Sequence, residues 1–219
     1  MRCQATYFDA NGVLQTAGID EPVFEYRPES GELWLRKGQQ ETNEIPSTFG
    51  RLLESDYSAN KEMFFQDVQA ILPTGETGTA TLAGWGGSRT RVQTGAADRS
   101  AKKYGVFIKF PDGAADTVLQ LSSQGENIRI NMRTLTPEQA PVNSWRLRPV
   151  AHGWAFLEWS GDAEAYSAIN ITRADGQFAE NTSVMFWAMQ QYVSDEFDIA
   201  PILSNNGATI RAADDIRVT

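Results

Sequence analysis

The sequence predicts an all-β protein, an antiparallel β-sandwich of jelly-roll type preceded by an N-terminal β-arm. Short apolar runs recur along most of the chain, and clusters of Gly, Pro, Asp and Asn separate them, which is the pattern of sandwich strands and their turns. Of the 219 residues, 41% are hydrophobic and 21% are charged, so the chain can bury a sizeable core in one main domain. No segment repeats at a fixed period, which argues against a propeller or a solenoid.

Residues 1–38 are predicted to form the β-arm from two hairpins. Asn11-Gly12 stands between Tyr7-Phe8 and Val13-Leu14, and an Asn-Gly pair tolerates the positive φ of a hairpin turn. Pro28–Gly31 offers a second turn. Because an isolated hairpin is at best marginally stable, we expect each to be covered by a sheet, a neighbouring subunit or the main domain. The aromatic residues of the arm that we assign to docking and assembly are Tyr7, Phe8, Phe24, Tyr26 and Trp34.

Residues 39–62 are polar and turn-rich and are interpreted as a connector, and the sandwich with its C-terminal tail is predicted over residues 63–219. The first sandwich segment, residues 60–71, has some helical spacing of apolar residues, but the alternation around Phe65 and Asp67 favours a strand. Further strands are expected at the apolar runs 80–83, 104–110, 117–121, 128–132, 145–150, 154–159, 168–171 and 184–187.

The end of the chain resembles a known family. The run Val184–Gln190 is apolar on both sides of a strand, which predicts that both of its faces are covered. An Asp-rich link and the run Asn206–Asp215 follow it. This order resembles the end of the jelly-roll domains in tail, fibre and other virion proteins of tailed bacteriophages. Those jelly rolls are similar to carbohydrate-binding modules and concanavalin-like domains.

Other short stretches resemble the same family in the same order and together cover most of the chain. Three stretches are similar to the lead-in segment of those proteins: Ala5–Thr16, Pro22–Tyr26 and Ser30–Leu33. A further pair, Leu72–Gly75 with Thr79–Leu82, is similar to their first sandwich hairpin. Two later strands of the family are similar to Tyr104–Lys109 and Gly153–Glu158.

The resemblance implies a non-enzymatic virion structural protein, of tail, fibre or decoration type, that is assembled in the host cytoplasm. Its expected partners are other virion proteins and further copies of itself, with a host-surface glycan as a further ligand. A carbohydrate-binding module of a bacterial polysaccharide-active protein is the alternative from another class. A purely structural tail or decoration protein without any ligand fits the sequence equally well.

Charge and residue usage exclude several classes of function. The net charge of −9 argues against binding to nucleic acid, because affinity for a phosphate backbone comes largely from clustered Lys and Arg. Cys3 is the single cysteine and cannot form an intrachain disulfide. No apolar stretch follows Arg2 and no window approaches about 18 apolar residues, so we expect neither a signal peptide nor membrane insertion.

Catalytic motifs are largely missing from the sequence. His152 is the only histidine, which excludes His-rich metal sites, and its place before Gly153-Trp154 predicts a turn at a strand edge. A glycosidase needs only two carboxylates at a suitable distance, so glycoside hydrolysis stays open as an alternative. The candidate carboxylates are Asp195, Glu196 and Asp198, or Glu158 and Asp162. Because acidic loop residues are common in a chain of this charge, we expect no enzymatic activity.

Two acidic clusters contain oxygen ligands of the kind that Ca²⁺ prefers. The candidate ligands are Asp112 and Asp116 in one cluster and Asp195 and Asp198 in the other. Jelly rolls of the resembled family often carry a structural calcium. The spacing matches no defined calcium loop, so solvated turns are the favoured interpretation and no other cofactor is expected.

A glycan site needs flat aromatic rings that stack on a sugar, with polar groups nearby that bind its hydroxyls. Trp85 stands in a Gly-rich loop beside Arg89 and Arg91, and is therefore the first candidate. Trp145 and Trp159 are the next candidates. A loop tryptophan that folds over the core or docks on another subunit is an equally good interpretation.

Overall fold

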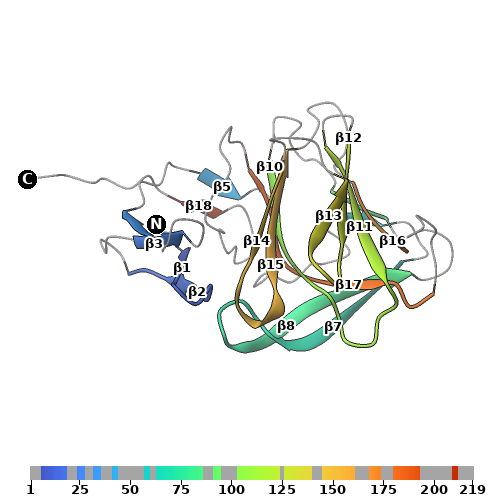
Figure 1. Ribbon diagram of the computed structural model, residues 1–219, viewed down its shortest axis with the longest axis horizontal. Coiled ribbons are helices and arrows are strands. Elements are labelled where there is room, and N and C mark those ends of the chain that lie inside the picture. Colours follow the sequence, from blue (N-terminus) through green and yellow to red (C-terminus); the bar gives the residue numbers. More distant parts are fainter. Residues whose placement is uncertain are drawn as a thin grey trace, which may run out of the picture.

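The computed structural model of the protein describes residues 6–18, 24–27, 32–35, 41–43, 57–59, 63–85, 91–94, 103–123, 126–139, 145–160, 168–173, 180–192 and 209–211. Within these ranges the elements are β-strands and one short 3₁₀ turn, η2 (Ala151–Gly153). All the strand pairs are antiparallel and two six-stranded sheets face each other (Figure 1). The prediction of an all-β antiparallel sandwich is confirmed.

The first sheet, sheet I, has the strand order β14-β15-β10-β17-β8-β7. Its strands are β7 (Met63–Ile71), β8 (Thr77–Trp85), β10 (Lys103–Lys109), β14 (Trp145–Pro149), β15 (Ala155–Ser160) and β17 (Ser183–Tyr192). The second sheet, sheet II, has the order β13-β12-β11-β16-β9-β6. Its strands are β6 (Tyr57–Ala59), β9 (Arg91–Thr94), β11 (Thr117–Ser123), β12 (Glu126–Asn131), β13 (Thr136–Gln139) and β16 (Ala168–Arg173).

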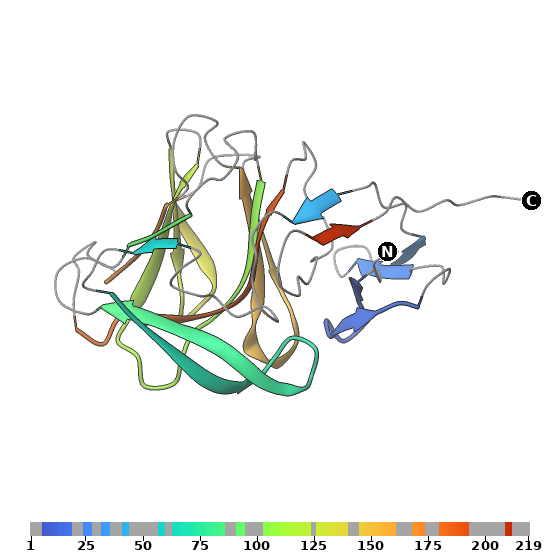
Figure 2. The ribbon, with the colours of Figure 1, turned by 180° about the vertical axis from the view of Figure 1, so that it is seen from behind.

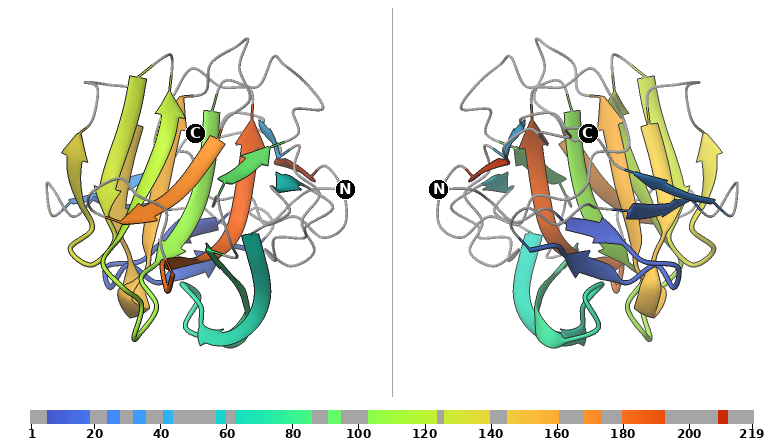
Figure 3. Two further views of the ribbon diagram at one scale, coloured as in Figure 1. Left: turned by 90° about the vertical axis from the view of Figure 1, so that its right-hand side faces the viewer. Right: turned by 90° about the vertical axis from the view of Figure 1, so that its left-hand side faces the viewer.

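The chain alternates between the two sheets as it does in a jelly roll. It passes from β8 in sheet I to β9 in sheet II, returns to β10, and crosses again before β11, β14, β16 and β17, so that neighbouring strands come from distant parts of the sequence (Figure 3). The strand expected over residues 60–71 is present as β7. The segment interpreted as a connector contributes β6 to the edge of sheet II.

The main hydrophobic core lies between the sheets. Alternation along each strand points one side chain in two inward, so Val106, Leu157 and Phe186 of sheet I face this core and are fully buried. Sheet II contributes the buried side chains of Leu119, Leu121, Ile128, Ile130 and Ile171. This dense apolar layer is the main source of stability, because each buried side chain of this size contributes about 1.5–3 kcal/mol.

The opposite face of sheet I is also apolar. Phe107, Phe156 and Trp187 alternate with the core residues and form a second buried cluster on this outer face. β17 therefore has both faces covered, as its sequence predicts. The registers of β17 and β10 shift by one residue between Trp187 and Gln190, and Ala188 in this bulge has a φ of 49°.

The N-terminal hairpin covers this outer cluster. It consists of β1 (Thr6–Phe8) and β2 (Leu14–Thr16), and Phe8 and Leu14 are each only 3% exposed. The amide of Leu14 donates a hydrogen bond to the carbonyl oxygen of Pro73 (2.9 Å), and the amide of Ala151 donates to that of Gly12 (3.0 Å). Side-chain packing and backbone hydrogen bonds therefore fix this part of the arm on the sandwich of its own chain.

The turn of this hairpin is held by Asp9. One carboxylate oxygen of Asp9 accepts hydrogen bonds from the amides of Asn11 (2.8 Å) and Val13 (3.0 Å). Gly12 has a φ of 72°, a left-handed conformation that glycine adopts without strain. The Asn-Gly signal thus predicts the hairpin correctly, although only its glycine takes the positive φ.

Two further strand pairs lie beside the sandwich (Figure 2). β3 (Phe24–Arg27) and β4 (Glu32–Leu35) form the second predicted hairpin, and β3 lies beside β1. β5 (Glu41–Asn43) pairs with β18 (Thr209–Arg211), so the segment after the arm meets the C-terminal tail. The backbone of β5 also lies beside that of β17 in sheet I.

Candidate functional site

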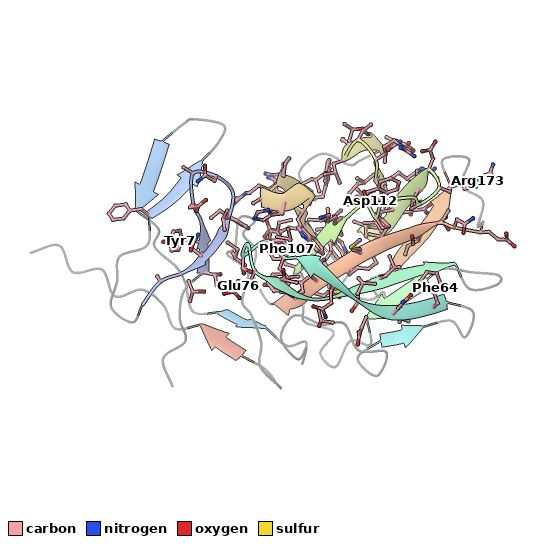
Figure 4. The ribbon with its side chains drawn as sticks, turned by 90° about the horizontal axis from the view of Figure 1, so that it is seen from below. Tyr7, Phe64, Glu76, Phe107, Asp112 and Arg173 are labelled. Atoms are coloured by element: carbon pink, nitrogen blue, oxygen red, sulfur yellow. The ribbon has the colours of Figure 1, made fainter. Side chains whose placement is uncertain are left out.

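A cavity of about 400 Å³ opens on the outer face of sheet I, where β7, β8 and β17 meet the loop after β10; we call it the corner pocket. Its lining residues are Phe64, Leu82, Pro111, Asp112, Gly113, Ala114, Glu180, Asn181 and Ser183. Small-molecule sites commonly have volumes of about 300–1,000 Å³. Phe64 and Asp112 lie toward the same end of the sandwich, away from Tyr7 and the N-terminal hairpin (Figure 4).

The base of the corner pocket presents an aromatic ring. Phe65 packs against the main core, so alternation along β7 places Phe64 on the outer face, where its side chain is 37% exposed. Phe64 stands opposite Gly84 in β8, and a Cβ at Gly84 would come within 2.7 Å of two atoms of the ring. The ring therefore covers a bare glycine, and its position depends on the missing side chain.

Two turns form the rim of the pocket. The loop after β10 contains Gly113 with a φ of 79°, and the turn before β17 contains Asn181 with a φ of 62°. Glycine and asparagine are the residues that most readily adopt this left-handed conformation. The amide of Ala115 donates a hydrogen bond to the carbonyl oxygen of Asn181 (3.0 Å), which ties the two turns together.

Polar groups around the rim are available to a ligand. Asp112, Glu180 and Asn181 are exposed, and their side chains make no hydrogen bond or ion pair with the part of the chain that the structure describes. The hydroxyl of Ser183 adds a group that can donate and accept. The lining residues that the structure describes include no Lys or Arg, so this part of the pocket combines an aromatic base with a rim of hydrogen-bond acceptors.

The two described candidate calcium ligands, Asp112 and Asp116, have different surroundings. Asp112 is part of the corner pocket, whereas Asp116 accepts a hydrogen bond from the guanidinium Nε of Arg133 (2.8 Å) in an exposed ion pair. Asp195 and Asp198 lie outside the described residues. Within the described ranges, no group of three or more His, Cys, Asp or Glu side chains could hold a metal ion. The calcium site stays a prediction.

The two later glycan candidates belong to the inner face of sheet I. Trp159 is fully buried, and its ring stacks on that of Tyr104 with centroids 5.3 Å apart. Trp145 stands opposite Trp159 across the β14–β15 pair and packs, partly buried, against the main core. The structure therefore places Trp159 in the core, where it offers no surface for a sugar to stack on.

The first glycan candidate combines Trp85, Arg89 and Arg91, and the structure describes the backbone of only two of them. Trp85 ends β8 of sheet I opposite Met63, and Arg91 begins β9 of sheet II opposite Asn170. The backbone positions of Trp85 and Arg91 thus belong to different sheets. Their side chains, and all of Arg89, lie outside the described residues.

The arm residues assigned to docking have different surroundings. Phe8 is buried on the sandwich of its own chain, and Tyr7 is half-buried beside it. Phe24 is 49% exposed on β3. Tyr26 lies on β3 and Trp34 on β4, and their side chains lie outside the described residues.

A second cavity, of about 220 Å³, lies where the hairpin turn meets β14. The guanidinium of Arg148 lies over the ring of Phe8, 5.4 Å from its centroid. The second carboxylate oxygen of Asp9 accepts a hydrogen bond from the side chain of Gln15 (3.1 Å). The polar groups of Asp9 and Arg148 already contact residues of the hairpin, so this cavity is a weaker candidate than the corner pocket.

A buried polar pair lies at the opposite end of sheet I from the corner pocket. The ammonium group of Lys103 donates a hydrogen bond to the hydroxyl of Ser160 (3.1 Å), and both residues are 6% exposed. Some hydrolases activate a serine with a lysine. Neither of the two cavities described above reaches this pair, and Glu158, a glycosidase candidate, is only 3% exposed. His152 is exposed in the turn η2 with a φ of 60°.

Sequence reasoning did not single out most of the corner pocket. Its residues come from β7, β8, the loop after β10 and the turn before β17, and nothing in their spacing predicts that these segments meet. Asp112 was singled out only as a candidate calcium ligand, and Phe64 carried a further usable signal. Two consecutive aromatic residues on a strand point to opposite faces, so one ring of the Phe64-Phe65 pair had to lie outside the main core.

Comparison with known proteins assigns no family. No protein-family model matches the chain, and no curated protein matches it. Within the described ranges, the structure contains no helix of the length and apolarity that crossing a membrane requires.

Proposed function

We propose that the protein is a non-enzymatic structural protein of a tailed-bacteriophage particle, of tail, fibre or decoration type. It is assembled in the host cytoplasm, associates with further copies of itself and with other virion proteins, and contacts glycans on the host surface. The motif order along the chain supports this assignment, and the β-sandwich with its N-terminal arm is the architecture that this resemblance implies.

The single observation that carries the assembly role is the exposed side chain of Phe24 on the second hairpin of the arm. β3 and β4 pair only with each other among the described strands, and Phe24 on β3 is 49% exposed. A two-stranded hairpin is marginally stable in water, and it gains stability when another surface covers its apolar side. The arm thus has one hairpin sealed on its own sandwich and one that presents an aromatic residue.

We assign a second copy of this chain as the partner of the second hairpin. Most soluble oligomers are symmetric assemblies of identical chains, and repetition turns weak glycan contacts into useful avidity. Other virion proteins would then bind the assembled form.

The mass of the full chain in solution, measured by light scattering across a range of concentrations, tests this role. We expect an oligomer that the Phe24→Ser variant shifts to monomer. Ile71→Ser is the matched control, because Ile71 is also 49% exposed but lies on the sandwich, and it should leave the mass unchanged. A wild-type chain that stays monomeric, or a Phe24→Ser variant with wild-type mass, would refute assembly through this hairpin.

A carbohydrate-binding module of a bacterial polysaccharide-active protein is the second candidate. The corner pocket favours it, because its aromatic ring is exposed and its polar side chains bind no other residue that the structure describes. Such a cavity suits a sugar whether or not the chain oligomerises. A monomer that binds polysaccharide would favour this candidate over the virion protein.

A further inference from the structure

We propose that the corner pocket is the saccharide site of this protein and that it selects neutral sugars. The inference rests on the glycan contact in the proposed function, which it locates and restricts to one chemical class. It moves the site from the Trp85 loop to the outer face of sheet I.

The base of the pocket suits the apolar face of a pyranose ring. Phe64 offers an aromatic surface that is 37% exposed, and Leu82 from the neighbouring strand adds an apolar contact. Gly84 carries no side chain, which leaves room for the Phe64 ring to lie over it. Apolar C–H groups of a sugar pack on such a ring, whereas its hydroxyls remain at the rim of the contact.

The rim of the pocket suits the hydroxyls of the sugar. The carboxylates of Asp112 and Glu180 can only accept hydrogen bonds, and sugar hydroxyls are donors. The amide of Asn181 can donate to a sugar oxygen as well as accept. Hydrogen bonds to ionised groups are about twice as strong as neutral ones, so two carboxylates without a partner in the described chain are strong recognition groups.

The charge of the rim determines which sugars fit. Among the described residues that line the pocket there are two carboxylates and no lysine or arginine, and the whole chain has a net charge of −9. Sialic acids, uronic acids and sulfated sugars would bring a third negative charge to the site and be repelled. The pocket therefore favours neutral hexose units.

The rim at Gly113 leaves room for a longer glycan. A Cβ placed on Gly113 would meet no atom within 4 Å, so the described part of the rim is open on this side. We therefore expect the site to bind a unit within an oligosaccharide as well as a free sugar.

Saturation-transfer NMR with the full chain tests the site. The probes are neutral gluco-, galacto- and manno-configured oligosaccharides, with sialylated, uronic and sulfated oligosaccharides as the charged set. We expect at least one neutral oligosaccharide to bind. The Phe64→Ala variant should weaken it about tenfold or more, because an aromatic anchor carries much of the binding energy in such a pocket. Ile71→Ala, on the same strand outside the pocket, should bind as the wild type does.

A second variant and a metal control separate the remaining explanations. Asp112→Asn keeps the shape of the side chain and removes its charge, so it should weaken neutral binding and reduce the exclusion of acidic sugars. Addition of EDTA should change nothing, because the carboxylates contact the sugar directly. Binding that EDTA abolishes would overturn this inference in favour of a bridging calcium ion.

Absence of binding by every neutral probe, equal binding by wild type and Phe64→Ala, or a preference for acidic sugars would each overturn the inference. The experiments distinguish a failure of the saccharide site from a failure of the assembly role. Phe64→Ala should keep the solution mass of the wild type, so loss of sugar binding with an unchanged oligomer refutes only the pocket. A monomeric wild type that still binds the sugar refutes only the assembly role.

Discussion

The ring of Phe8 on the N-terminal hairpin meets the ring of Phe107 in the middle of sheet I edge-on, with centroids 6.1 Å apart and planes inclined by 67°. Phe8 also contacts Phe156 on the neighbouring strand, at 6.4 Å between centroids. Edge-to-face pairs add about 0.5–1.5 kcal/mol to the burial of the rings themselves. This contact makes the first part of the arm a component of the sandwich.

The Phe8→Ala variant tests how much this contact stabilises the fold. Phe8 is 3% exposed, so its removal leaves a cavity over Phe107 and Phe156 and should lower the free energy of unfolding by about 3–5 kcal/mol. Denaturant titration measures the change. Thr16→Ser, at an exposed position of the same hairpin, should stay within about 0.5 kcal/mol of the wild type. A Phe8→Ala variant as stable as this control would mean that the hairpin is not packed in solution.

Gly12 and Gly113 provide a matched pair of substitutions. Both have positive φ, 72° and 79° respectively, so alanine at either position should cost about 1–2 kcal/mol of backbone strain. A Cβ on Gly12 would also approach the backbone of Ala151 and Val150 to 3.2 and 3.3 Å, whereas one on Gly113 meets nothing. We expect Gly12→Ala to lower the thermal midpoint more than Gly113→Ala. Equal losses would show that the turn does not approach the backbone of Val150 and Ala151 closely.

The buried hydrogen bond between Lys103 and Ser160 should matter more than an exposed one of the same kind. Ser160→Ala removes an acceptor from a lysine that is 6% exposed and should cost about 1–3 kcal/mol. The exposed bond from Gln69 to the hydroxyl of Thr79 is the comparison, and Thr79→Val should cost within about 0.5 kcal/mol. Chemical unfolding of the two variants distinguishes them. A Ser160→Ala variant no less stable than Thr79→Val would show that Lys103 does not need this acceptor.

The ion pair between Asp116 and Arg133 should contribute little. The two side chains are 69% and 59% exposed, so Asp116→Asn should change the free energy of unfolding by less than about 1 kcal/mol. The same variant tests Asp116 as a calcium ligand. Because Asp116 already bonds to a guanidinium, we expect the thermal midpoint of wild type and variant to respond equally to calcium and to EDTA. A response that the variant alone loses would assign Asp116 to a calcium site.

Local signals in the sequence predicted the elements well. Asn11-Gly12 indicated the first hairpin, and the alternation around Phe65 indicated strand β7, because both depend only on neighbouring residues. The strand Val184–Gln190 was correctly expected to be covered on both faces. The sequence did not indicate what covers its outer face, because the hairpin residues that share its cluster lie near the other end of the chain.

The candidate site was harder to predict for the same reason. A tryptophan on a strand can face the core or solvent, and only the register of β15 against β10 places Trp159 inward beside Tyr104. The corner pocket needs the turn at Asn181 to meet the loop at Gly113, which no local pattern specifies.

The N-terminal hairpin packs on the sandwich of its own chain, and hydrogen exchange of two amides tests this packing. The amide of Leu14 bonds to Pro73, and the amide of Ala151 bonds to Gly12, so each bond joins the hairpin to the sandwich. We predict that both amides exchange as slowly as those of the core strand β10, and that their protection does not depend on protein concentration. Rapid exchange would show a detached hairpin, and protection that appears only at high concentration would show that a second copy supplies the contact.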